Sequence, residues 1–335
     1  MAQVQQHDDV TQLRHLAEAV GSLRQQVSQR IVGQTEVVDG VLTALLAGGH
    51  SLLIGVPGLA KTLLVSTIAE ALDLSFNRVQ FTPDLMPGDI TGTELVEEDP
   101  ATGRRGFRFV PGPVFANVLL ADEINRTPPK TQAALLQAMQ EHQVTAAGKT
   151  YPLPDPFFVL ATQNPIEQEG TYPLPEAQLD RFMLELRVGY PSRDDEEQVV
   201  ERTTGESVVT IAPVLDSAEI IAIQRLVRRI PVSKGLVRAA VTLARMTRPV
   251  AAESPKFIRE FVEWGAGPRA SQYLVLGAKA RAAMDGRPMA DLDDVKTVAP
   301  AVLRHRIVTN FSAEAAERTS ESLVTELVSS AGWDG

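Results

Sequence analysis

The chain reads Gly55-Val56-Pro57-Gly58-Leu59-Ala60-Lys61-Thr62 at the stretch that decides its fold. This stretch follows a short apolar run at 51–54 and precedes a helix-like segment at 63–71. This is the order of elements found at phosphate-binding loops: a strand, a glycine-bearing loop, a Lys-Thr pair and a helix. The loop amides and the positive end of the helix dipole attract an anion. The pattern therefore predicts a nucleotide site. A glycine turn capped by a helix is the simpler alternative.

Two side chains at the end of this stretch carry its chemistry. Lys61 can reach the outer phosphates of a nucleotide as a point charge, and the Thr62 hydroxyl is placed to hold Mg²⁺. Ala60 stands where the usual pattern has glycine, so we expect a conformational cost if that residue needs a positive φ. The candidate nucleotide-binding residues here are Gly55, Val56, Pro57, Gly58, Leu59, Ala60, Lys61, Thr62 and Leu63.

Composition indicates an ordinary globular protein with room for two domains. The 335 residues are 44% apolar and 22% charged, and they include no cysteine. The lack of cysteine excludes disulfides, a thiol nucleophile and cysteine-ligated metals, and it fits a reducing compartment. The first residues lack the pattern of a signal peptide, and the apolar run at 41–47 is too short to span a bilayer. We therefore expect a cytoplasmic protein without a membrane span.

The net charge of −10 is unevenly distributed along the chain. Residues 1–189 hold 13 basic and 22 acidic side chains, whereas the remainder holds 19 and 20. A nucleic-acid binder needs a basic stripe, so the acidic first part makes that class of function unlikely. Seven basic residues between 225 and 248 are the best counter-evidence, but their helical spacing favours a solvated helix face or ion pairs.

Short apolar runs alternate with helical stretches over the first 189 residues. Helices are expected at 10–29 and 35–47, and buried strands at 75–81, 117–121, 157–161 and 182–188. Such runs separated by helices are typical of a parallel sheet covered on both faces. After residue 189 the strand-like runs disappear and apolar residues recur at helical spacing, which indicates a second, α-helical domain.

Two hairpins are expected within the α/β part. The first pairs 90–97 with 104–110 around a turn-rich centre at 98–103, and the second spans 143–151. Their alternating patterns around turn residues are typical of hairpins. Because the two hairpins lie on either side of one acidic motif in the sequence, we interpret them as functional additions.

That acidic motif is Asp122-Glu123, which closes the apolar run at 118–121. At the carboxyl end of a parallel strand, both side chains lie where open α/β sheets bind ligands. Asp122 is then placed to complete the Mg²⁺ shell opposite Thr62, and Glu123 to polarise the attacking water. Asn164 ends the next apolar run and can hold the water or the γ-phosphate from the side. A polar turn after each strand is the alternative in both cases.

Longer runs narrow the interpretation beyond P-loop proteins in general. They are Gly55 to Thr62, Leu119-Leu120-Ala121-Asp122-Glu123-Ile124-Asn125-Arg126, Ala161 to Pro165, and Glu176-Ala177-Gln178-Leu179-Asp180-Arg181-Phe182. With 81–89 and 170–175 they resemble the MoxR group of AAA+ ATPases, closely over residues 30–190 and loosely beyond. Ala-Lys-Thr is frequent in that group, so Ala60 fits the resemblance.

The resemblance implies an α/β P-loop AAA+ core, residues 1–189, whose parallel sheet is covered by helices, followed by an all-α lid domain, residues 190–335. It also implies ATP and Mg²⁺ as cofactors and a homo-oligomeric, typically hexameric ring. Gln34 would border the adenine. Arg181 looks like the arginine finger that reaches a neighbouring subunit's γ-phosphate, with Arg126 a weaker candidate, and Arg269 looks like the second sensor that ties the lid to the phosphate.

The resemblance suggests a Mg·ATP-hydrolysing, chaperone-like remodeller of partner proteins, including one with a von Willebrand factor A (VWA) domain whose metal site it fills or rearranges. The expected catalytic residues are Lys61, Glu123, Asn164, Arg181 and Arg269, and the metal ligands are Thr62 and Asp122. The hairpins resemble the helix-2 and pre-sensor inserts of the branch that holds the magnesium chelatase motor subunit. A nucleotide-gated scaffold with little turnover, a chelatase-like motor and a DNA-remodelling motor remain alternatives.

Overall fold

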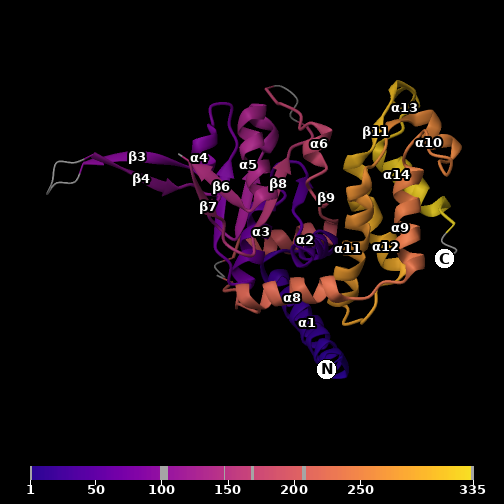
Figure 1. Ribbon diagram of the computed structural model, residues 1–335, viewed down its shortest axis with the longest axis horizontal. Coiled ribbons are helices and arrows are strands. Elements are labelled where there is room, and N and C mark those ends of the chain that lie inside the picture. The colour runs from indigo at the N-terminus through magenta and orange to yellow at the C-terminus, as the bar shows by residue number, and fades with distance from the viewer. Residues whose placement is uncertain (1, 99–104, 147, 167–169, 206–208, 333–335) are drawn as a thin grey trace.

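Five parallel strands form the central sheet of the computed structural model, which describes residues 2–98, 105–146, 148–166, 170–205 and 209–332 (Figure 1). The sheet order is β2-β5-β8-β1-β9. The strands are β1 (Ser51–Ile54), β2 (Phe76–Gln80), β5 (Val118–Asp122), β8 (Phe158–Gln163) and β9 (Leu184–Arg187). All five expected strands are therefore present, and β1, β5 and β8, which precede the three predicted motifs, are neighbours in the centre.

Alternate side chains of these strands pack against helices on opposite faces of the sheet. Leu53 and Leu120 belong to one hydrophobic cluster, together with α1 (Ala2–Arg30), α2 (Thr35–Ala47) and α3 (Lys61–Ala71). Leu52 and Leu119 belong to the other, with α4 (Pro87–Thr91) and α5 (Pro129–Glu141). Because both faces of the sheet are covered, the central strands β1, β5 and β8 are mainly apolar, and their sequences read as apolar runs.

Both expected hairpins form, and they pack against each other near the sheet. The first consists of β3 (Gly92–Glu98) and β4 (Arg105–Pro111), which extend far from the body in Figure 1. Its predicted turn spans 98–103, of which residue 98 ends β3 and residues 99–103 lie outside the described residues. The second consists of β6 (Gln143–Ala146) and β7 (Lys149–Pro152). The rings of Phe109 and Tyr151 stack with centroids 4.1 Å apart and join the two hairpins.

The second half of the chain is helical, and in Figure 1 most of it lies on the side of the sheet opposite the first hairpin. Its helices are α7 (Arg193–Thr203), α8 (Ser217–Arg229), α9 (Lys234–Met246), α10 (Lys256–Phe261), α11 (Pro268–Met284), α12 (Leu292–Leu303), α13 (Phe311–Ala315) and α14 (Ser320–Ser330). A two-stranded ribbon of β10 (Val262–Trp264) and β11 (Val308–Thr309) is an addition that the sequence did not predict. None of the helices in the described part of the chain combines the length and apolarity that crossing a membrane demands.

Capping residues in the sequence mark where several of these helices begin. Asp216 accepts a hydrogen bond from the Glu219 N–H, and the Glu219 carboxylate accepts one from the Asp216 N–H, so the two residues form a capping box at α8. Asp291 and Asp294 do the same at α12. Such caps satisfy N–H groups that the first helical turn leaves without partners.

One hydrophobic cluster joins the helical part to the sheet. It runs from Leu16 of α1 and Leu45 of α2 to Leu274 of α11 and Val302 of α12. Residues 209–216, before α8, lie against α1 and α3, where Arg30 donates to the Val209 carbonyl and the Val214 N–H donates to the Ala71 carbonyl (2.8 Å). The fold class is as expected, and the domain boundary at 189/190 stays a prediction.

His50, in the loop before β1, is a buried histidine whose charge state the surrounding backbone fixes. The Val159 N–H donates to Nδ1 (3.1 Å), so the ring proton is on Nε2, which lies 3.2 Å from the Met139 carbonyl oxygen. Burial lowers the pKa of His50 to about 4. The folded protein therefore holds this side chain neutral, and it ties α5 to β8.

We expect His50 to make folding sensitive to mild acid. The unfolded chain takes up a proton below pH 6.5 and the folded chain only near pH 4, so a contribution of about 3 kcal/mol is lost as the pH falls through this window. His50→Gln should therefore lower the free energy of unfolding at pH 7.5, and its gap from wild type should narrow toward pH 4.5 in urea titrations. The exposed His15→Gln is the control. A pH-independent gap would contradict this account.

Candidate functional site

The three motifs converge on one cavity at the carboxyl edge of the sheet. Its volume is about 510 Å³. It lies where β1, β5 and β8 end side by side, and the Gly55 N–H donates across this edge to the Gln163 carbonyl (3.2 Å). The residues that line it are Pro57, Gly58, Leu59, Ala60, Lys61, Thr62, Leu63, Arg78, Gln80, Asp122, Glu123, Thr162 and Asn164.

The loop between β1 and α3 contains residues with positive φ angles and one close backbone approach. Gly58 has a φ of 85°, and a Cβ atom on Gly55 would lie 2.8 Å from the Val188 carbonyl oxygen. Ala60 is the residue before α3 and has φ 54° and ψ 23°, in the left-handed region. The cost expected at Ala60 is therefore real, because its Cβ crowds the backbone in this conformation.

Lys61 is the first residue of α3, and its side chain folds back over the loop. Its Nζ donates to the carbonyl oxygens of Gly55 (2.5 Å) and Val56 (2.9 Å). Burial lowers the pKa of Lys61, and the negative charges of Asp122 and Glu123 act in the opposite direction. The lysine and both acids of the predicted motif are thus electrostatically coupled around one cavity.

Both carboxylate oxygens of Asp122 have protein partners. Oδ1 accepts from the Thr162 hydroxyl (2.5 Å), and Oδ2 accepts from Arg78 Nη2 (2.6 Å) and Nε (3.1 Å). The side chain of Asp122 is mostly buried, at 11% exposure, so this pairing compensates the cost of burying its charge. These partners fix the direction in which the Asp122 carboxylate points.

Glu123 is held in a strained conformation beside it. Its φ is 57°, which is uncommon for any residue but glycine and is found where function demands it. Its Oε2 accepts from Gln80 Nε2 (2.6 Å) and lies 3.1 Å from Arg126 Nε. The Glu123 N–H donates to the Thr162 hydroxyl (2.9 Å). Thr162 therefore links both acids of the motif.

Arg78, Gln80 and Thr162 are site residues that sequence reasoning missed. In the sheet, Gln80 is paired with Asp122, and Arg78 lies two residues earlier on the same side of β2. The alternation of Arg78 and Gln80 along β2, which places both side chains on one side of the strand, was the available signal. Recognising it required knowing that β2 pairs with β5.

Asn164 lines the cavity, and Gln34 contacts the loop at its side. Asn164 is 6% exposed and lines the cavity, and its Oδ1 accepts from the Ile166 N–H (3.1 Å). Gln34 precedes α2 with a φ of 55°, and its Nε2 donates to the Leu59 carbonyl (3.3 Å). Its Oε1 is buried without a hydrogen-bond donor among the described residues. Gln34 thus contacts the phosphate loop.

Two of the expected arginines lie together, outside this cavity. Neither Arg181 nor Arg269 lines it. Arg269, at the start of α11, pairs with Asp180 (Nη1 to Oδ2, 3.0 Å). The Tyr273 hydroxyl of the same helix donates to the Arg181 carbonyl (3.4 Å). The predicted residues therefore fall into two groups. Lys61, Thr62, Asp122, Glu123 and Asn164 line the cavity at the strand ends, which we call the phosphate-side cavity, and Arg181 and Arg269 lie outside it.

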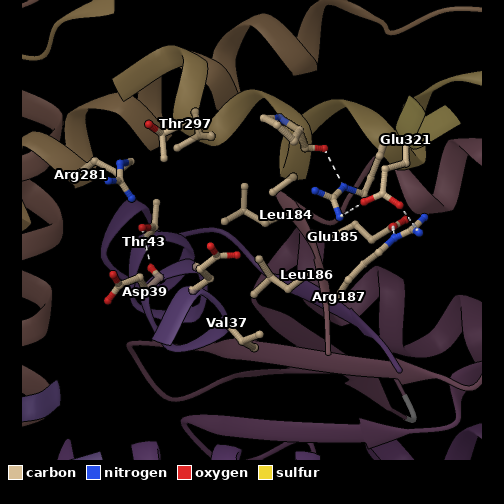
Figure 2. A pocket seen from close by; sticks show the side chains of 16 residues that line it. Val37, Asp39, Thr43, Leu184, Glu185, Leu186, Arg187, Arg281, Thr297 and Glu321 are labelled. Atoms are coloured by element: carbon tan, nitrogen blue, oxygen red, sulfur yellow. Dashed lines mark hydrogen bonds and ion pairs between the residues drawn. The ribbon is translucent and has the colours of Figure 1, made fainter. Parts of the chain in front are cut away.

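A second cavity, of about 600 Å³, separates α2 and β9 from α11, α12 and α14 (Figure 2). Glu185 lies in its wall, and burial raises the pKa of this carboxyl. Arg187 donates to both Glu185 (3.3 Å) and Glu321 (2.5 Å). The cavity shares no residue with the phosphate-side cavity and belongs to the junction between the two parts of the chain.

Two family models match the chain. Residues 50–184 match the model described as the ATPase family associated with various cellular activities (AAA), and residues 256–327 match the AAA lid domain. The first match contains all three motifs at the phosphate-side cavity. The second begins in α10 and ends in α14, so it covers the arginine-bearing helix α11.

Relatives resemble the chain over most of its length. The chaperone MoxR1 of Mycobacterium tuberculosis is 43% identical over 90% of this chain and 79% of its own. The protein YeaC of Bacillus subtilis is 40% identical over 92% of this chain and 93% of its own. A crystal structure from Cytophaga hutchinsonii, described as that of a candidate ATPase, superposes with a TM-score of 0.89 at 38% identity, covering 96% of this chain and 97% of that one.

We expect Ala60→Gly to stabilise the folded protein, although glycine usually destabilises. At a left-handed position the substitution removes the Cβ clash, so the free energy of unfolding should rise by about 0.5–1 kcal/mol. Ala222→Gly, on the exposed side of α8, is the matched control and should lower it by a similar amount. Urea unfolding followed by circular dichroism measures both. Equal destabilisation by the two variants would show that residue 60 is not strained.

Proposed function

Because the chain belongs to the MoxR type of AAA+ ATPases, and is thus an ATP-hydrolysing enzyme, we propose that it uses Mg·ATP to remodel partner proteins as a chaperone-like motor. The observation that carries the proposal is the convergence of Lys61, Thr62, Asp122, Glu123 and Asn164 on the phosphate-side cavity. These residues come from three strand ends and supply one cation, one hydroxyl, two acids and one amide.

The donor set at this cavity fits magnesium. Thr62 and Asp122 offer oxygen atoms, which Mg²⁺ prefers, and Mg²⁺ usually takes only one or two protein ligands besides phosphates and waters. In keeping with this, the described residues include no cluster of three or more His, Asp or Glu side chains that would form an all-protein metal cage. When bound, the ion would neutralise charge on the phosphates. Thr62 and Asp122 would be the residues that hold it.

The remaining side chains have distinct roles in the proposed reaction. Lys61 would exchange its two loop carbonyls for phosphate oxygens, a stronger, charge-assisted pairing. Glu123 would orient and deprotonate the attacking water, which requires it to turn from Gln80. Asn164, fixed by the Ile166 N–H, would hold the water or the γ-phosphate. Gln34 would border the adenine.

A ring, typically of six subunits, would complete the site. Arg181 does not line the cavity of its own chain, and no hydrogen bond or ion pair holds its guanidinium among the described residues. Arg269 forms an ion pair with Asp180, the residue before Arg181. We propose that Arg181 acts on the γ-phosphate of a neighbouring subunit, where a guanidinium stabilises developing charge, and that Arg269 is the second sensor that ties the lid to the phosphate. Arg126, close to Glu123 of its own chain, is the weaker candidate for this role.

From the family resemblance, we propose that the client is a protein with a VWA domain. The ATPase would fill or rearrange the metal site of that domain. The two hairpins, joined by the Phe109–Tyr151 stack, are the surface we propose for client contact. A cytoplasmic location, in keeping with the cysteine-free sequence, is part of the same proposal.

Three alternatives remain. A scaffold with little turnover is disfavoured by the complete set of hydrolytic side chains. A DNA-remodelling motor is disfavoured because Arg229 and Arg245 of the basic stretch pair with Asp9 and Glu253. A magnesium-chelatase-like motor shares the mechanism and differs in its client.

Mixing two inactive variants tests the shared site. Arg181→Ala and Glu123→Gln should each lose steady-state ATPase activity, by about 10³-fold or more for the finger. When they are mixed before assembly, an intact phosphate side from one variant meets an intact Arg181 from the other at roughly a quarter of the interfaces. Activity should therefore recover toward that fraction. A mixture of Lys61→Ala and Glu123→Gln should stay inactive. No recovery at any ratio would overturn the shared site.

A trapped state tests the remodelling role. Glu123→Gln should bind Mg·ATP without hydrolysing it, so affinity-tagged protein should retain a VWA-domain client more strongly with ATP than with ADP. Lys61→Ala, which should not bind ATP, is the matched control. Equal recovery of such a client in all arms would contradict nucleotide-driven client binding.

A further inference from the structure

The segment Asp180–Met183, which carries Arg181, is held by side chains of the helical part. It lies between α6 (Glu176–Leu179) and β9. Its four carbonyl oxygens, one per residue, all accept hydrogen bonds from Arg306 or from Tyr273. The backbone around the proposed finger is thus bonded to α11 and to η2 (Arg304–Arg306).

Arg306 makes most of these bonds. Its Nη2 donates to the carbonyls of Asp180 (2.9 Å) and Phe182 (2.6 Å), and its Nη1 to that of Met183 (3.3 Å). Its Nε donates to Asp180 Oδ1 (2.8 Å), and Nη1 also donates to the Val302 carbonyl. All five N–H groups of the guanidinium therefore have acceptors.

The position of Arg306 shows that this contact is built into the fold. Its side chain is 2% exposed, and its charge is balanced by Asp180, which also pairs with Arg269. The guanidinium lies 5.1 Å from the centroid of the Tyr273 ring. Burying a cation is costly unless its partners are well placed. Here the Val302 carbonyl is one hydrogen-bond acceptor, and the backbone and a side chain of the segment Asp180–Met183 provide most of the rest.

The backbone of Arg181 is held by hydrogen bonds, but within the described part of the chain its side chain is not. It is half-buried, and within the described ranges no hydrogen bond or ion pair fixes its guanidinium. Its Cα is thereby anchored while its charged group stays available to a ligand outside this chain. A side chain that must meet a phosphate in a neighbouring subunit needs this combination, because a displacement of about 1 Å can cost about 10²-fold in rate.

We propose that Arg306 is a positioning residue for Arg181, which it places for the neighbouring subunit's active site and couples to the orientation of the lid helices. The proposal rests on the proposed function, in which Arg181 acts in trans. Arg306 touches no nucleotide. It acts by fixing the Asp180–Met183 backbone, so movement of α11 and η2 moves the finger.

Arg306→Lys tests this role because lysine keeps the charge but has three donors on one nitrogen and cannot serve acceptors spread along a backbone. The ATPase kcat should fall by about 10- to 100-fold, with KM for ATP changed less than about twofold, since the phosphate side of the same chain is intact. Arg304→Lys is the matched control. Arg304 lies in the same turn but bonds Pro300 and Glu321, and it should retain near-wild-type kcat.

Complementation separates positioning from general damage. Arg306→Lys mixed with Glu123→Gln should regain activity, because the second variant brings a well-placed finger to the first variant's intact phosphate side. Arg306→Lys mixed with Arg181→Ala should gain no activity over Arg306→Lys alone, because both fingers are defective. The reverse pattern would overturn the proposal by placing the defect at the phosphate side. Failure of the Arg181→Ala and Glu123→Gln pair as well would instead reject the shared site itself.

If Arg306→Lys does not fold, Tyr273→Phe provides the second variant. It removes only the hydroxyl that donates to the Arg181 carbonyl and keeps the ring against Arg306. A smaller fall in kcat, of about two- to fivefold for one weak hydrogen bond, with the same complementation pattern supports the proposal. An unchanged kcat, or rescue by Arg181→Ala, would count against it.

Discussion

Parallel alignment of β1, β5 and β8 is the constraint on which the rest of this structure depends. Parallel strands end at the same edge, so each residue that follows one of them lies within reach of the others. Lys61, Asp122 and Asn164 are far apart in the sequence and lie around one cavity for this reason. The continuous apolar strands, buried on both faces, hold this edge rigid. The charged side chains lie just beyond the ends of these strands, where the hydrophobic core ends.

The parts of the site that the sequence predicted are those carried by continuous motifs. The loop at 55–62 and the acids at 122–123 each contain their strand, their turn and their reactive residue, so local pattern and chemistry agree. Arg78 and Gln80 escaped prediction because their role depends on β2 pairing with β5, a contact between residues more than forty positions apart. The β10–β11 ribbon escaped for a similar reason: its two strands are too short to show an alternating pattern.

The lid's hold on Asp180–Met183 shows another limit of sequence reasoning. Arg306 stands among other basic residues at 304–306 and has no pattern that marks it as buried. Only the folded chain shows that Arg306 is almost fully enclosed while Arg304 pairs with an exposed acid. Arg181, by contrast, was found through family resemblance. The two kinds of evidence are complementary: continuous motifs predict the residues around the cavity at the strand ends, and packing shows that Arg306 holds the segment that carries Arg181.

The stacked rings of Phe109 and Tyr151 have a mechanical consequence. They clamp together two antiparallel arms that leave the body before β5 and after α5, the elements that flank Glu123. Phe109 pairs with Glu94 of β3, so residues 95–98 reach about 13 Å beyond the clamp. A tilt of about 10° at the clamp would therefore move the end of β3 by about 2 Å. A small rotation of the elements beside Glu123 would thereby become a displacement of more than half the rise of one strand residue at the end of the arm.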